Sequence, residues 1–147
     1  MRTDFITTAI VVTLDVALFA TPERAVNAKD ICARHGWTHR NCEGMLQALV
    51  RGGVLAGHRG PTGGYRLAPG AWSKTLAEVG KLAIRTSRAT AKGEKTKDAA
   101  AALHFVELAE HAYWAELGRV TIEEAAAYEA ESVARHILER GDNGERV

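Results

Sequence analysis

The sequence predicts a mainly α-helical fold that contains one small β-hairpin and ends in a long helical region. Three observations carry this prediction. Apolar residues recur at helical spacing in several successive segments, a glycine-dense turn separates two short extended runs, and no apolar run reaches the roughly 18 residues that span a bilayer. The chain of 147 residues, 46% hydrophobic and 25% charged, therefore fits a small globular domain with an appendage rather than a disordered or membrane protein.

Cysteine usage and the N-terminal residues indicate a cellular compartment. Two cysteines, Cys32 and Cys42, are too few to staple a secreted scaffold, and the carboxylate of Asp4 stands where a signal peptide has its basic start. We therefore expect a cytoplasmic protein with free thiols. Both cysteines fall on apolar helix faces, where a thiol behaves as a small hydrophobe, and redox sensing is the alternative interpretation.

The net charge of +1 hides an uneven distribution of charge along the chain. Residues 1–75 contain nine basic and five acidic residues, whereas the remainder contains ten basic and thirteen acidic residues. Between Arg24 and Arg66 there are seven basic residues and two acidic ones, with three histidines in addition. A basic first part predicts a polyanion-binding surface, and an acidic second part predicts a solvated or self-associating one.

Helical spacing predicts a first helix over residues 5–20, ended by Pro22. A short second helix over residues 28–35 has Asn27 as its N-cap candidate. Asp30 lies three positions further on, where its carboxylate can return a hydrogen bond to the backbone N–H of the cap.

A third helix follows a turn that contains Gly36, a residue suited to the left-handed position after a helix. Thr38 is its N-cap candidate. One face of this helix is apolar at i, i+3, i+4 and i+7, and these residues are Cys42, Met45, Leu46 and Leu49. The other face is polar and carries His39, Arg40, Glu43 and Gln47. Two short helices joined in this way form a helix-turn-helix.

The next segment has the pattern of a hairpin. Residues 54–59 and 65–68 are extended runs on either side of a turn dense in glycine, which places Arg59 and Arg66 near the tip. A capping box over residues 75–78 then opens another helix.

The last third of the chain is predicted to be helical after a polar linker over residues 86–97. One helix covers residues 98–117, and another, opened by a capping box, covers residues 121–139. Apolar residues spread over more than half of the circumference of the first, so we expect it to contact a second copy of the chain through Leu103, Phe105, Val106 and Trp114. The predicted division is therefore 1–85, 86–97 and 98–147.

A helix-turn-helix followed by a basic, glycine-rich hairpin is the order of a winged helix-turn-helix, a fold that binds double-stranded DNA. A helix fits the major groove, and its N-terminal residues reach the base edges; here these are Thr38, His39, Arg40 and Glu43. The hairpin offers phosphate contacts from two arginines and a close backbone approach at its glycines, through Arg59, Gly63, Gly64, Tyr65 and Arg66.

Two sequence motifs resemble the Rrf2 family of bacterial transcription regulators. They are Leu46-x-x-Leu49-x-x-Gly52/Gly53-Val54-Leu55 and Arg59-Gly60-x-x-Gly63-Gly64-Tyr65-x-Leu67. The resemblance covers residues 5–85 and implies a homodimer with crossing C-terminal helices that binds a partly palindromic operator. Members that bind an iron–sulfur cluster carry three cysteines around the start of the long helix, and residues 86–108 contain none. We therefore predict a repressor without a cluster or other cofactor.

Two other functions are compatible with the same pattern. A winged helix also serves as a protein-interaction module, and a regulator of this kind can hold a small-molecule effector at its dimer interface. No nucleophile–base pair, phosphate-binding loop or usefully spaced pair of acids supports an enzyme. His104, Glu107 and His111 share one helix face and are a weak candidate metal site, because three ligands from one helix lack a fourth partner.

Overall fold

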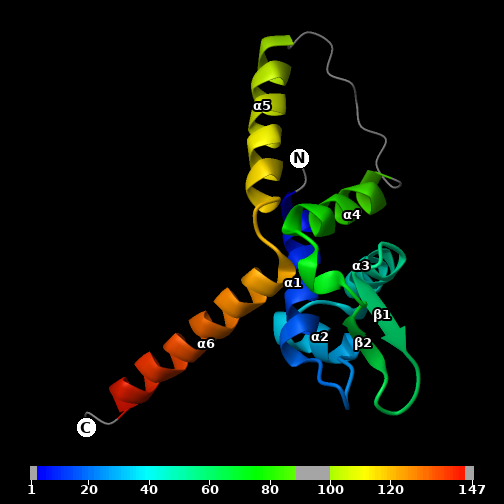
Figure 1. Ribbon diagram of the computed structural model, residues 1–147, viewed down its shortest axis with the longest axis vertical. Helices are drawn as coiled ribbons and strands as arrows, with labels where there is room; N and C mark the ends of the chain where they lie inside the picture. Colours follow the sequence, from blue (N-terminus) through cyan, green and yellow to red (C-terminus); the bar gives the residue numbers. More distant parts are fainter. Residues whose placement is uncertain (1–2, 89–99, 145–147) are drawn as a thin grey trace.

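The computed structural model describes residues 3–88 and 100–144, with side chains for residues 4–40, 42–85 and 107–138. Six helices and one two-stranded antiparallel sheet make up the described part of the chain (Figure 1). The elements are α1 (Thr3–Phe19), α2 (Ala28–His35), α3 (His39–Arg51), β1 (Leu55–His58), β2 (Gly64–Leu67), a 3-10 turn (Ala71–Ser73), α4 (Leu76–Arg88), α5 (Ala100–Leu117) and α6 (Ile122–Gly144). The predicted mainly helical fold with a hairpin is thus confirmed.

Helices α1 to α4 and the hairpin form one body, from which α5 and α6 extend in different directions (Figure 1). Helix α1 lies at the centre and packs against α2, α3, α4 and α6. Its inward face is fully buried at Ile6, Val12 and Val16, and the opposing core side chains include Leu46 and Leu49 of α3. Burying this apolar surface is what stabilises the body.

The predicted helix boundaries are largely correct because local capping sets them. Asn27 accepts a hydrogen bond from the backbone N–H of Asp30 at 2.8 Å, and Gly36 adopts a left-handed φ of 65°. The Asp30 carboxylate, however, accepts from the side-chain amide of Asn27 at 3.0 Å and not from its backbone N–H. Thr38 has the extended backbone of an N-cap, but its side chain makes no capping hydrogen bond.

Both downstream capping boxes form as predicted. Glu78 accepts from the backbone N–H of Thr75 at 2.7 Å, and Glu124 accepts from that of Thr121 at 2.9 Å. Helix α4 continues to Arg88, into the segment expected to be a linker, and residues 89–99 lie outside the described residues. Helix α6 continues to Gly144, beyond its predicted end near residue 139.

The start of α6 belongs to the same core as the helix-turn-helix. Ile122 is fully buried, and its backbone N–H donates to the carbonyl of Lys74 at 2.9 Å. The N–H of Leu76 donates to the carbonyl of Val120 at 2.8 Å, so the connection from α5 to α6 is tied to the start of α4. None of the described helices is both long enough and apolar enough to cross a membrane.

Candidate nucleic-acid interface

Helix α3 separates its residues into one buried and one exposed face. Cys42, Leu46 and Leu49 are fully buried, whereas the predicted reading residues Thr38, His39, Arg40 and Glu43 are all exposed. The buried stripe fixes the rotation of the helix, so the polar residues at its N-terminal end face outward together.

Arg40 and Glu43 lie three residues apart, where an ion pair between them would reduce their availability. In the described part of the chain neither of them has an ion-pair partner within 4.0 Å; ion pairs there involve other residues. Both side chains are therefore free to meet an external partner, which favours base reading over an internal surface pair.

The hairpin places its two arginines differently. Arg59 lies in the exposed turn between β1 and β2 next to Gly60, whose φ of 111° and open surroundings suit a close approach. Arg66 lies opposite Ala56 in the strand ladder, so the expectation that it is near the tip is wrong. Its guanidinium donates to the carbonyls of Thr21 and Pro22 at 3.0 and 3.1 Å.

Close backbone contacts within the chain explain two glycines of the hairpin motif, Gly63 and Gly64. A Cβ on Gly64 would overlap the backbone of Val26, and a Cβ on Gly63 would lie 2.5 Å from the carbonyl oxygen of His58. Tyr65 exchanges two backbone hydrogen bonds with Val26, at 2.7 and 3.0 Å. Together with Arg66, these residues fasten the hairpin to the connection between α1 and α2, which sets its position beside α3.

A buried carboxylate, which sequence reasoning did not single out, joins α1 to the helix-turn-helix. Asp15 is only 4% exposed; it accepts from Arg34 Nε at 2.8 Å and lies 2.9 Å from His35 Nε2. The Asp15 carboxylate raises the pKa of Arg34, with its hydrogen bond the largest cause. His35 stacks on Trp37 with ring centroids 4.8 Å apart, directly before Thr38. The only signal in the sequence was an acid that interrupts an apolar run.

Contacts within the chain already engage several of the basic residues between Arg24 and Arg66. Arg34 is paired with Asp15, Arg66 is bound to backbone carbonyls, and Arg24 lies 3.9 Å from Asp30. The remaining basic residues of the stretch are exposed, and no ion pair engages them within the described structure; they are Lys29, Arg40, Arg51 and Arg59. The charge available to a polyanion is therefore smaller than the residue count implies.

The predicted dimer residues are only partly described. The helix at Leu103, Phe105 and Val106 is described but their side chains are not. Trp114 is half-buried against α4 of its own chain: a Cβ on Gly80 would lie 3.1 Å from the indole ring, and Lys81 Nζ lies 5.7 Å from the ring centroid. Trp114 thus docks α5 onto the body.

The comparisons with known proteins identify the family. The family model described as "Iron-dependent Transcriptional regulator", Rrf2, matches residues 2–128. The chain belongs to the Rrf2 family of transcriptional regulators. A curated relative, the putative HTH-type transcriptional regulator BadM of Rhodopseudomonas palustris, is 37% identical over 62 residues. That match covers 42% of this chain and only 40% of BadM.

Solved structures of similar fold include other transcription regulators. CymR of B. subtilis, the global cysteine regulator, has a TM-score of 0.60 and 19% identity, covering 84% of this chain and 94% of that one. CymR of Staphylococcus aureus has a TM-score of 0.64 and 16% identity, covering 84% of this chain and 95% of that one. IscR of T. potens has a TM-score of 0.61 and 19% identity, covering 88% of this chain and 85% of that one. At these identities the likeness concerns the fold.

The family description implies iron, and the thiols of this chain do not fit an iron centre. Cys32 and Cys42 lie inside the helix-turn-helix, both buried, and burial together with the neighbouring Cys32 raises the pKa of Cys42 to about 12. Within the described residues no three histidine, cysteine or acidic side chains are grouped to hold a metal. For the candidate set on α5, Glu107 and His111 are exposed, and the side chain of His104 lies outside the described ones.

Proposed function

We propose that this Rrf2-family regulator binds double-stranded DNA with α3 in the major groove and the β1–β2 turn on the adjacent backbone. The observation that carries the proposal is the exposed, unpaired polar face at the start of α3, together with the exposed turn that carries Arg59. Arg40 suits a guanine edge, and Glu43 accepts from a donor such as the cytosine amino group. Thr38 and His39 stand at the helix start, where backbone N–H groups and the helix dipole favour a phosphate.

The proposed active form is a homodimer. Helix α6 has one apolar stripe that is buried at Ile122 and Ala126 by its own chain and continues exposed along the helix. Val133 is 49%, Ile137 65% and Leu138 74% exposed on a helix that extends away from the body (Figure 1). A long helix with an uncovered apolar face gains most of its stability from packing, and a second copy offers the same face in return.

The chain's own core decides how dimerisation should be tested. Removing residues after 97 would also remove Ile122 from the core around α1 and so destabilise the body itself. We therefore propose Ile137→Glu, which alters only the exposed part of the stripe, with Glu131→Gln as a control on the same helix. Ile137→Glu should shift the sedimentation of the protein at micromolar concentration from dimer to monomer, and the control should not.

We further propose that the regulator acts as a repressor in the cytoplasm and needs no iron–sulfur cluster. Cluster iron is held mainly by cysteine thiolates, and moving either buried thiol toward α5 would dismantle the helix-turn-helix. DNA binding should therefore be the same before and after exposure to oxygen or nitric oxide. A brown preparation with stoichiometric iron and sulfide would contradict this.

The decisive experiment is selection of bound DNA from a random pool. A homodimer with two equivalent α3 helices should select two half-sites about one helical turn apart, related by a two-fold axis. Arg40→Ala should lower affinity for the selected site by about 1–3 kcal/mol and relax one base position, whereas Arg59→Ala should weaken all sequences alike. Recovery of no preferred sequence, with an affinity that does not depend on salt, would refute the proposal and favour a protein-interaction module.

A further inference from the structure

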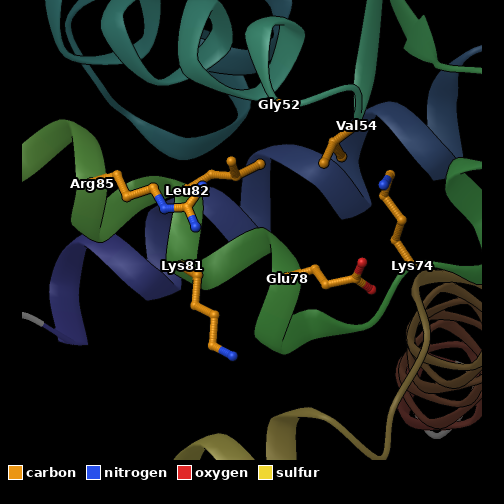
Figure 2. Close-up of a pocket in the computed structure, with 7 residues that line it drawn as sticks. All are labelled: Gly52, Val54, Lys74, Glu78, Lys81, Leu82 and Arg85. Atoms are coloured by element: carbon orange, nitrogen blue, oxygen red, sulfur yellow. The ribbon is translucent and has the colours of Figure 1, made fainter.

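The two ends of α3 are held in place by different means. At the C-terminal end, Gly52 lies directly against Leu82 of α4, where a Cβ on Gly52 would overlap the Leu82 side chain (Figure 2). At the N-terminal end, the first buried side chain among the described ones is Cys42, and the Thr38 side chain makes no capping hydrogen bond. The exposed residues of the first turn therefore depend for their position on the residues that precede the helix.

A chain of three side chains joins α1 to the start of α3. His35, the last residue of α2, has its Nε2 2.9 Å from Oδ2 of Asp15 on α1. The imidazole ring of His35 stacks on Trp37 at an interplanar angle of 28°. Trp37 packs against the hydrophobic core and directly precedes Thr38. His35 thus contacts the buried carboxylate with one edge and the residue that leads into α3 with its face.

The charge of Asp15 does not require His35. Arg34 pairs with both oxygens of the carboxylate, with Nε 2.8 Å from Oδ2, and its guanidinium lies over the ring of Phe19. The carboxylate is therefore a fixed acceptor. An ionised carboxylate only accepts hydrogen bonds, so Nε2 of His35 is the donor, and this bond sets the orientation of the imidazole ring. A ring held in one orientation limits the positions open to the indole stacked on it.

We propose that His35 is a positioning residue for sequence reading by α3. It holds Trp37, and through Trp37 the first turn with Arg40, in the orientation that reaches the base edges. A side chain that reads a base must be held within about 0.5 Å of its productive position, so a small displacement of this turn is sufficient to lose the contact. This role rests on the proposed function, because it concerns which bases α3 reads.

Two variants interrupt the contacts of His35 at different points. His35→Phe keeps a ring on Trp37 but removes the hydrogen bond to Asp15, whereas His35→Gln keeps an N–H donor but removes the ring. The measurement is the ratio of two affinities: for the selected operator, and for the same operator changed at the base pair whose preference Arg40→Ala relaxes. Each variant should lower this ratio about two- to tenfold, the range for one lost hydrogen bond.

The affinity ratio distinguishes positioning from a simple loss of folded protein. Unfolding lowers the affinity for every sequence by the same factor and leaves the ratio unchanged. The affinity for unrelated DNA and its dependence on salt should stay as in the wild type, because phosphate contacts determine both. The control His136→Gln replaces an exposed histidine of α6 and should leave the ratio unaltered.

A second measurement uses the protein without DNA. In both His35 variants, the NMR order parameters of the backbone amides of residues 38–40 should fall from about 0.85, typical of rigid backbone, toward about 0.6. Those of residues 45–49 should not change. A wild-type affinity ratio in either variant, or unaltered order parameters at residues 38–40, overturns the proposal. A wild-type protein that selects no sequence refutes the proposed function instead, and the order parameters then decide whether His35 holds the start of α3.

Discussion

Replacing Asp15 by asparagine tests whether one buried carboxylate holds the helix-turn-helix against α1. Asparagine keeps the shape and one acceptor oxygen but removes the charge that pairs with Arg34 and faces His35. Breaking a fully buried ion pair destabilises a protein by about 3–5 kcal/mol. The Arg34 and His35 side chains are 33% and 30% exposed, so water screens part of the interaction.

Asp15→Asn should therefore lower the free energy of unfolding by about 2 kcal/mol, which is close to the contribution of a hydrogen bond to a charged group. For a chain of this length it corresponds to a decrease of about 4–8 °C in Tm. Arg34→Gln should cost at least as much, because it leaves the buried Asp15 charge with His35 alone. Urea unfolding monitored by circular dichroism gives the free energy of unfolding of the wild type and of both variants.

The matched control is Glu116→Gln, which removes a carboxylate from an i, i+3 pair with Arg119 at 3.6 Å on the surface. That change should leave the urea midpoint unaltered, since both side chains are about three-quarters exposed. Asp15→Asn with a stability within about 0.5 kcal/mol of the wild type, the size of an ordinary surface change, would refute the reasoning.

Three further outcomes are expected. Gly64→Ala should destabilise the protein strongly because its Cβ meets the Val26 backbone and its φ is 141°, whereas Gly57→Ala, which meets no atom within 4 Å and has no positive φ, should be much milder; urea midpoints compare them. Arg66→Ala should weaken DNA binding without changing base preference, since it loosens the hairpin; an altered preference in selected DNA would contradict this. The hydrogen bond from the Thr75 backbone N–H lowers the pKa of Glu78 in the folded protein. The ionised Glu78 carboxylate therefore stabilises the fold fully above its ordinary pKa of 4.5, and this stabilisation is lost as pH falls through the folded pKa. The difference in free energy of unfolding between wild type and Glu78→Gln should shrink with falling pH.

Local signals in the sequence were sufficient for the helix-turn-helix. The caps at Asn27, Thr75 and Thr121 and the left-handed Gly36 depend on residues within three or four positions of one another. The burial of Cys42 and Leu46 followed from periodicity, which reports a helix face directly. These features are set by neighbours along the chain.

The features that were missed join distant parts of the chain. Asp15 and Arg34 are 19 residues apart, and Arg66 binds carbonyls 44 and 45 residues earlier. A charged residue gives no sign in the sequence of whether its partner is a phosphate or another part of the same protein. The sequence likewise suggests a close approach to DNA for the hairpin glycines, whereas Gly64 accommodates the backbone at Val26.

Because Arg24, Arg34 and Arg66 are engaged within the chain, a second copy matters for the affinity for DNA. Four exposed basic residues remain between residues 24 and 66 without an internal partner among the described ones: Lys29, Arg40, Arg51 and Arg59. If Lys29, Arg51 and Arg59 met phosphates while Arg40 met a base, one copy would show a slope of about −2.7 in log affinity against log salt, and a dimer would show about twice that. So few contacts give one copy a modest affinity, and joining two copies through α6 makes binding of the second half-site intramolecular. An Ile137→Glu monomer should therefore have half the salt slope of the wild type and a far lower affinity for the same operator.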